Sequence, residues 1–359
     1  MSDSIDLRTL PGSFVTHAVT GQGYFPVIAS LGGQRLALVM RGGAGHVGKG
    51  GRLDVVRSED GGRSWTTPVT AADSERDDRN PGFGLAPDGT LVLAYHWQGA
   101  YNEKGEWDPT VIRVDTRVTY SSDGGVTWKD DELINYIPLN GASPFGKIRA
   151  YDGVLYQMIY CGPTVGVTES TLRVGPATEP TYILRSKDNG RTWGDPILVA
   201  LGLNESDFLI LPDGAWLFVA RSEKEGEQSI YSCRSEDQGA TWRLLGRITE
   251  AAEHPPDLTR LGNGWLLLTF GHRHPPYGVQ AIISKDNGFT WEERRLMLDD
   301  TLAGGDSGYP STARLDDGRV ITSYYMAGSK EKQWEIHTAV NAACRIIGYD
   351  ENEMIAAFG

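Results

Sequence analysis

The sequence predicts an all-β protein in which one unit of antiparallel strands recurs along the chain, and two repeated turn motifs indicate it. The first motif is an octet with the pattern S-x-D-x-G-x-[ST]-W, found at 58–65, 121–128, 186–193, 235–242 and 284–291. The second is a glycine turn followed by an apolar strand, found at 32–33, 88–89, 152–153, 213–214, 263–264 and 317–318. Because the repeats fill the chain, residues 1–359 are expected to form a single domain.

The residue types of the octet suit a tight turn between two antiparallel strands. Asp and Ser side chains bond to nearby backbone N–H groups, Gly adopts the left-handed conformation, and Trp supplies a large apolar plug beneath the turn. Apolar and β-branched residues precede the octets, for example at 53–56 and 279–283, as expected for strands. Asp-Gly and Asn-Gly in the second motif are strong hairpin signals.

These octets resemble the Asp boxes of the sialidase (neuraminidase)-like superfamily of BNR-repeat β-propellers, and the resemblance covers nearly the whole chain. Six glycine turns and five octets predict a six-bladed β-propeller of four-stranded antiparallel blades, in which one blade lacks an Asp box. Strands from 14–19 and 334–346 are expected to share one blade and so close the ring. The boxes themselves are structural and do not identify a reaction.

The composition excludes several classes of partner. A net charge of −13 argues against nucleic acid and against anionic membrane surfaces, so a substrate carboxylate needs locally placed cationic side chains. No apolar run approaches the ~18 residues of a membrane span, and no signal peptide is visible at the start, which predicts a cytoplasmic protein. Three widely spaced cysteines do not suggest a disulfide framework.

Antiparallel strand order places the functional residues at the ends opposite the glycine turns. Residues nine before each turn glycine should neighbour those seven or eight after it, close to the axis. The first set is Tyr24, Asn80, Pro144, Glu205, Pro255 and Tyr309, and the second is Arg41, His96, Tyr160, Arg221, His272 and Tyr325. Interior strands rarely end in Arg or His unless these side chains meet something polar. The irregular loops 42–51, 98–108 and 162–179 should lie on the same face.

Two of these segments resemble catalytic segments of sialidases. Residues 204–221 resemble the segment that supplies a Glu and an Arg, and 308–325 resemble the segment with the nucleophilic Tyr. The resemblance implies Tyr309 as nucleophile, Glu205 as its base and Arg221 as a ligand of a substrate carboxylate. A phenol has a pKa of about 10 and needs a nearby base to attack at neutral pH. The alternative is a hydrogen bond at the rim between Tyr309 and Glu205 without catalysis.

The sequence also departs from the sialidase pattern. The early Phe/Tyr-Arg-Ile-Pro motif is Gly-Tyr-Phe-Pro at 23–26, without the Arg, and the loop 42–51 has no carboxylate to act as acid/base. Pro276 and Tyr277 stand where the third Arg of the carboxylate-binding triad is expected.

Histidines are concentrated on the predicted functional face, at His46, His96, His254, His272 and His274. Histidine transfers protons near neutral pH or binds metal. His254, Asp257 and His272 are of the residue types that bind zinc, but no compact motif such as H-E-x-x-H is present, so neither a metal nor a cofactor is predicted. His274 and His337 best fit solvated rim positions.

Three functions remain open. The leading one is an exo-acting, sialidase-type glycosidase for an acidic or polar terminal sugar, with Tyr309 and Glu205 in the roles above. His46, His96 or His272 would act as the general acid. The expected substrate-binding residues are Arg221, Arg41, Arg273, His254, Asp257, Tyr24 and Tyr325. The second is a uronate polysaccharide lyase in which a His/Tyr pair removes the C5 proton and protonates the leaving oxygen. The third is a non-catalytic glycan- or protein-binding protein that uses Trp97, Tyr101 and Trp107. The sequence leaves the oligomeric state open.

Overall fold

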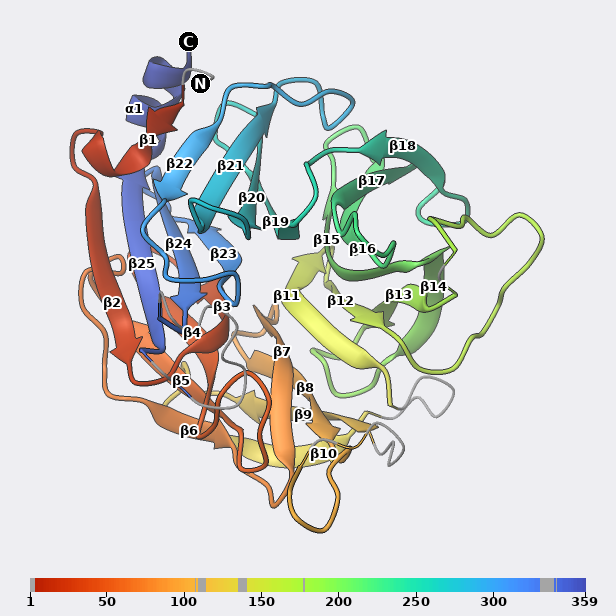
Figure 1. Ribbon diagram of the computed structural model, residues 1–359. Coiled ribbons are helices and arrows are strands. Elements are labelled where there is room, and N and C mark those ends of the chain that lie inside the picture. Colours follow the sequence, from red (N-terminus) through yellow and green to blue (C-terminus); the bar gives the residue numbers. More distant parts are fainter. Residues whose placement is uncertain are drawn as a thin grey trace.

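The computed structural model describes residues 4–106, 108, 114–134, 141–176, 178–329, 339 and 341–359. Trp107, His337 and the segment 334–338 therefore lie outside the described residues. The prediction of an all-β fold built from antiparallel four-stranded units is confirmed, and Figure 1 shows these units arranged around a common centre. The described residues contain one α-helix. None of their helices is long and apolar enough to cross a membrane.

The first half of the chain forms three four-stranded groups. The first is the sheet β3-β4-β5-β6 (Tyr24–Ser30, Leu36–Gly42, Arg52–Ser58, Val69–Ala72). The second is β7-β8-β9-β10 (Asp77–Leu85, Leu91–Gln98, Val114–Ser121, Lys129–Leu133). The third is β11-β12-β13-β14 (Ser143–Tyr151, Val154–Tyr160, Pro180–Ser186, Gly194–Leu201). A short parallel pairing of β7 with β11 joins the second and third groups into one eight-stranded sheet.

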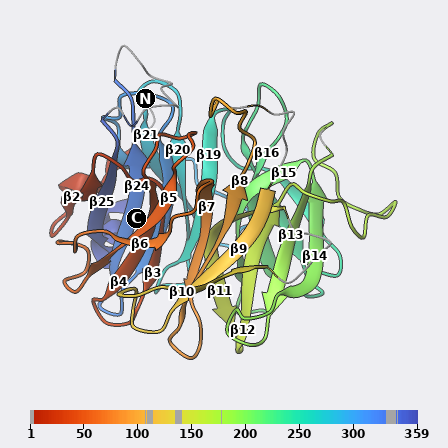
Figure 2. The same cartoon turned by 90° about the horizontal axis from the view of Figure 1, so that it is seen from below.

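The second half forms three more groups. The fourth is β15-β16-β17-β18 (Leu203–Ile210, Trp216–Ser222, Ile230–Ser235, Arg243–Arg247). The fifth is β19-β20-β21-β22 (Glu253–Arg260, Leu266–His272, Gly278–Ser284, Leu296–Asp299), and β1 (Ile5–Asp6), followed by the 3-10 helix η1 (Leu7–Thr9), adds to it in parallel. The sixth unites both ends of the chain in β23, β24, β25 and β2 (Gly308–Arg314, Arg319–Met326, Ala343–Asp350, Phe14–Thr20), and helix α1 (Glu351–Phe358) follows it. Figure 2 shows the sheets from the side, with strands running between two faces of the molecule.

The octets make the same turn at all five positions. The Ser hydroxyl donates to the Asp Oδ1 at 2.8–2.9 Å and accepts from the N–H of the octet Gly at 2.8–2.9 Å. The Ser or Thr before the Trp donates its hydroxyl to Asp Oδ2 at 2.6 Å. The Ser, Asp and Ser or Thr side chains of every octet therefore have local partners, which explains the spacing found in the sequence.

Apolar side chains fill the space between neighbouring sheets. Strands β4 and β20 are buried at every residue, because each lies in a sheet covered on both faces. This is why the strands that follow the glycine turns read as continuous apolar runs.

The strands nearest the centre in Figure 1 are β3, β7, β11, β15, β19 and β23, and all six carry an irregularity near their start. Three large residues there have a left-handed backbone: Phe25 (φ 53°), Asn80 (φ 53°) and Tyr309 (φ 49°). A bulge re-aims the side chains that follow it, and a left-handed non-glycine residue costs about 1–3 kcal/mol, which the surrounding structure must offset. The bulges therefore set which side chains face the centre.

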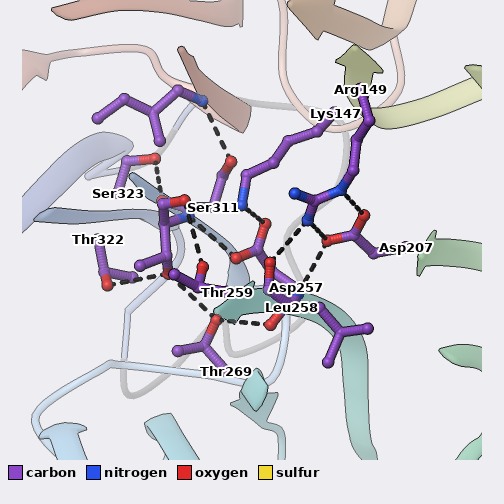
Figure 3. Close-up of polar contacts among 12 residues, drawn as sticks. Lys147, Arg149, Asp207, Asp257, Leu258, Thr259, Thr269, Ser311, Thr322 and Ser323 are labelled. Carbon is purple, nitrogen blue, oxygen red and sulfur yellow. Dashed lines mark hydrogen bonds and ion pairs between the residues drawn. The ribbon is translucent and has the colours of Figure 1, made fainter. Parts of the chain in front are cut away.

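Buried ion pairs link the central strands beneath these bulges (Figure 3). Arg149 on β11 forms two hydrogen bonds with Asp207 on β15 (2.8 and 2.5 Å) and one with the carbonyl oxygen of Leu258 on β19 (2.6 Å). Lys147 Nζ lies 2.6 Å from Asp257 Oδ1, and Asp257 Oδ2 accepts the backbone N–H of Thr312 on β23 (3.1 Å). This axial network fixes four central strands relative to one another, and the candidate site is built on the same strands.

Candidate active site around Tyr309 and Glu205

Tyr309 and Glu205 meet near the centre, at the starts of β23 and β15. Both are buried, and the Tyr309 hydroxyl donates a hydrogen bond to Glu205 Oε1. Arg221, at the end of β16, donates from Nη1 to Glu205 Oε2 (3.0 Å). Burial, together with the charge of Glu205, raises the pKa of Tyr309 above its ordinary value, so the phenol is protonated at neutral pH. Glu205 Oε1 is therefore the acceptor to which the phenolic proton can move.

The Tyr309 ring is held on several sides. Its centroid lies 5.0 Å from that of Phe25, 5.6 Å from Tyr325 and 5.9 Å from Phe145, and the Arg273 guanidinium carbon lies 4.9 Å from it. Between Tyr309 and the axial network there is only a small cavity of ≈ 20 Å³, about enough for one water. The ring is thus closed in on the side of the axial network.

Three arginines around this pair each keep a buried N–H group without a hydrogen-bond partner among the described residues: Nε of Arg79, Nε of Arg221 and Nη2 of Arg273. The Arg79 guanidinium carbon lies 5.8 Å from the centroid of Phe25, which packs on Tyr309. Arg273 is anchored by a hydrogen bond from its Nε to the carbonyl oxygen of Ser307 (3.1 Å). Buried donors without partners are costly, so each of these N–H groups can bind an anionic group.

The repeat spacing does not predict Arg79 as a site residue. The rule of nine residues before the turn glycine selects Asn80, but the bulge in β7 makes Arg79 the residue paired with His96. Arg79 could have been found from the sequence by applying the same spacing with a shift of one residue.

His46 reaches the site from the loop after β4 and pairs with a carboxylate there. Its Nδ1 lies 2.7 Å from Asp306 Oδ1, which also accepts the hydroxyl of Tyr325 (2.6 Å). Burial lowers the pKa of His46 below its ordinary value and outweighs the opposing effect of Asp306, so the ring is neutral at pH 7. A neutral ring that donates from Nδ1 to Asp306 presents Nε2 as a proton acceptor.

The loop 42–51 has no carboxylate, but Asp306 supplies one from a different segment. Asp306 precedes β23, and nothing in the repeat spacing marks it. Burial raises the pKa of Asp306, but hydrogen bonds from His46 and Tyr325 and nearby positive charge lower it further, so the net shift is downward. Asp306 is therefore an anion that orients His46.

Two further histidines are buried in this region. His96 Nδ1 lies 2.9 Å from the Ser143 hydroxyl, and Asn80 donates to both Ser143 (2.9 Å) and the hydroxyl of Tyr160 (3.0 Å). Burial places the pKa values of His96 and His254 well below the ordinary value, with nearby arginines adding to the effect. Nε2 of His96 and Nδ1 of His254 have no partner among the described residues, so both remain able to bind a ligand.

Three residues predicted from the sequence have other contacts. Arg41 is fully buried; it pairs with Asp77 and donates to the carbonyl oxygens of residues 45 and 48 (2.9 and 3.0 Å), so it holds the loop that carries His46. Asp257 belongs to the axial network. His272 contacts neither Tyr309 nor Glu205 among the described hydrogen bonds; its Nδ1 lies 2.9 Å from the carbonyl oxygen of residue 276.

Tyr24 is fully buried and supports the site through ring packing. Its centroid lies 5.0 Å from that of Tyr325 and 6.4 Å from that of His46. The structure thus brings together Tyr309, Glu205, Arg221, Arg273, His46 and Tyr325 from the predicted set, and adds Arg79 and Asp306.

Comparison with known families and structures identifies the fold. The family model of the BNR repeat-like domain matches residues 34–322. No curated protein matches the chain significantly.

Several solved structures have the same fold at low identity. A protein of unknown function from Dyadobacter fermentans is 22% identical over 95% of this chain and 100% of its own, with a TM-score of 0.71. The NanB sialidase of Streptococcus pneumoniae is 13% identical over 98% of this chain and 71% of its own (TM-score 0.68). The Trypanosoma rangeli sialidase, solved as a covalent intermediate with 2,3-difluorosialic acid, is 14% identical over 99% of this chain and 60% of its own (TM-score 0.67).

Proposed function

Because the chain belongs to the family of BNR repeat-like proteins in the sialidase-like superfamily, we propose that it is a six-bladed β-propeller with five Asp boxes whose centre acts as a glycosidase of sialidase type. The substrate class is a glycan with a terminal sugar that carries a carboxylate. Strands β2 and β25, paired in one sheet, would close the ring. The observation that carries the proposal is the buried hydrogen bond from Tyr309 to Glu205, braced by Arg221.

The chemistry follows from the protonation of this pair. The Tyr309 oxygen attacks the anomeric carbon while Glu205 takes its proton, and the bond to the leaving oxygen breaks. Water then attacks the glycosyl–tyrosine, and the phenol recovers its proton. Glu205 is well placed because its second oxygen is already bound to Arg221, which leaves Oε1 directed at the phenol.

The charge of the substrate is inferred from the arginines. The unpartnered N–H groups of Arg79, Arg221 and Arg273 offer charge-assisted hydrogen bonds to a carboxylate. Arg41, which the sequence suggested for this role, is left out because it is fully buried and bonded within its loop. The trypanosomal sialidase, which holds a fluorinated sialic acid covalently, supports this class of substrate.

His46 takes the role of the missing acid/base. With Asp306 on Nδ1, its neutral form accepts a proton at Nε2 from the attacking water in the second step. The protonated form of the same ring would give a proton to the departing oxygen in the first step. Because the pKa of His46 is lowered, that form is a minor one at neutral pH, and it becomes more abundant as the pH falls.

The neutral His46 also favours a second candidate function, a uronate lyase. There His46 would remove the C5 proton and the protonated Tyr309 would donate to the leaving oxygen, with the arginines on the uronate carboxylate. No covalent intermediate is needed in that reaction.

A product screen separates these candidates. Purified protein is incubated with terminal sialosides and with uronate-containing oligosaccharides, and released sugar is measured together with the ultraviolet absorbance of an unsaturated chain end. The proposal predicts release of the terminal acidic sugar without that absorbance, and loss of release in Tyr309→Phe. An unsaturated product would contradict the glycosidase proposal and favour the lyase. Binding without turnover on either class would identify a non-catalytic protein.

A further inference from the structure

A second cluster of ligand-type side chains lies beside the candidate active site. Glu253 begins β19 and pairs in register with His272 at the end of β20, and His274 follows two residues later. The Nε2 atoms of His272 and His274 lie 3.7 and 3.9 Å from Glu253 Oε1. The three donor atoms all lie within 4.8 Å of one another.

The other polar atoms of the two buried members are already engaged. His272 Nδ1 donates to the carbonyl oxygen of Pro276 (2.9 Å), which places the lone pair on Nε2. Glu253 Oε2 accepts hydrogen bonds from the backbone N–H of Glu250 (2.9 Å) and from Arg295 (3.2 Å), so Oε1 is the atom turned to the imidazoles. Metal-binding imidazoles and carboxylates are usually oriented by such outer contacts.

A simple ion pair explains this arrangement poorly. Distances of 3.7 and 3.9 Å are too long for hydrogen bonds between Glu253 and the two rings. The centroids of the rings of His272 and His274 are only 3.8 Å apart, so two imidazolium charges would repel each other.

We propose that Glu253, His272 and His274 bind one divalent transition-metal ion of the Zn²⁺ type, with solvent completing the coordination. Bonds of about 2.0–2.2 Å in tetrahedral geometry separate ligand atoms by roughly 3.3–3.5 Å, so the two distances from Glu253 Oε1 need to contract by a few tenths of an ångström. Two imidazoles favour Zn²⁺, Co²⁺, Ni²⁺ or Cu²⁺ over Mg²⁺ or Ca²⁺. His274 is 44% exposed on its side chain, which gives the ion a path from solvent.

These ligands differ from the set His254, Asp257 and His272, of which only His272 is shared. Asp257 is bound to Lys147 in the axial network and is not directed at His272. The proposed ligands matter for the candidate active site because of Arg273. In the sequence this residue stands between His272 and His274, and its guanidinium lies over the ring of Tyr309. A bound ion would fix both neighbours of Arg273, so the metal acts in positioning and not in the reaction itself.

Metal binding by the full-length protein tests the inference without any activity assay. The protein is dialysed against a chelator, then titrated with Co²⁺, followed by its visible absorption, and with Zn²⁺, followed by calorimetry and melting temperature. We expect one equivalent per chain and a rise in melting temperature. His274→Ala and Glu253→Gln should each weaken binding by at least about 100-fold, since loss of an outer contact alone commonly costs 10–100-fold.

The matched control is His17→Ala, which removes a histidine of β2 whose ring is next to Arg345. It should bind like the wild type. Because His274 is half-exposed, His274→Ala is expected to stay folded, and circular dichroism checks this. The inference is overturned if the wild type binds no more tightly than His274→Ala, or if His17→Ala weakens binding equally.

Discussion

Tyr309 and Glu205 are 104 residues apart in the sequence, yet the hydroxyl of one donates to the carboxylate of the other at the centre of the molecule. They start two different central strands, β23 and β15, which the polar contacts along the axis hold at a fixed separation. The pair therefore depends on the whole fold, and its geometry gives direct predictions.

Removing the base should act on turnover more than on binding. Glu205→Gln keeps the shape and an oxygen near Tyr309 but does not accept the phenolic proton. We expect kcat to fall by about 10²–10⁴-fold with a small change in KM. Steady-state kinetics on the substrate found in the product screen measures this. A variant with unchanged kcat would remove Glu205 from the reaction.

The arginines should act mainly on binding of the substrate carboxylate. Arg221→Lys keeps the charge but loses the planar two-point contact, at a cost of about 1.5–3 kcal/mol in binding. We expect the same for Arg273→Lys. Arg260→Lys is the control, because Arg260 lies at the far end of β19, beside a separate cavity. Equal KM values for Arg221→Lys and Arg260→Lys would contradict the anion site.

The octet tryptophans should affect folding and not chemistry. Trp193 is buried in the cluster between the second and third strand groups, away from Tyr309. Trp193→Ala should lower the free energy of unfolding by ~3–5 kcal/mol and leave the kinetics of the folded protein unchanged. Val126→Ala, at an exposed octet position, should be nearly neutral in the same denaturant titration. Loss of activity in a Trp193→Ala protein of normal stability would reverse this assignment.

The axial ion pairs should be costly to break. Arg149→Met leaves Asp207 buried without its partner and should lower the free energy of unfolding by about 3–5 kcal/mol. Chemical denaturation measures the loss, with Arg260→Met as the exposed comparison. Similar stability of the two variants would show that Arg149 contributes no more than a surface arginine.

Stability should fall as the solution becomes acidic, because buried histidines resist protonation. Burial lowers the pKa of His46, His96 and His254 in the folded protein, whereas in the unfolded chain they titrate near 6.5. Below about pH 6.5 the unfolded state binds more protons, so the free energy of unfolding decreases as the pH falls and is unaffected by these groups above that range.

The variant His96→Asn isolates this effect, since it keeps a polar group beside Ser143. Between pH 7.5 and 5.5 its free energy of unfolding should depend less on pH than that of the wild type. If the free energies of unfolding of the two proteins changed equally with pH, His96 would not be the group whose protonation is resisted.

The sequence predicts the strand groups well, because the octet and the glycine turn depend on local hydrogen bonds that recur at fixed spacing. The same spacing selects Tyr309, Glu205 and Arg221, which begin or end central strands. The repeat spacing does not predict Arg79, because a bulge moves the strand pairing by one residue and a bulge has no pattern in the sequence.

Other features of the site depend on contacts between distant segments. Asp306 meets His46 from a loop of a different sheet, and no repeat marks either loop. His272 has the predicted spacing, but its ring bonds to the carbonyl oxygen of Pro276 in the following turn and faces Glu253. Such tertiary contacts decide which of several rim histidines reaches the centre.

The most direct measurement is the mass of the intact protein after reaction with a fluorinated acidic sugar that forms a glycosyl–enzyme quickly and releases it slowly. We predict a mass increase of one sugar on the wild type, mapped to Tyr309 by peptide analysis, and none on Tyr309→Phe. Turnover of the natural substrate with no adduct on the wild type, or an adduct on another residue, would contradict the assignment of Tyr309 as the nucleophile.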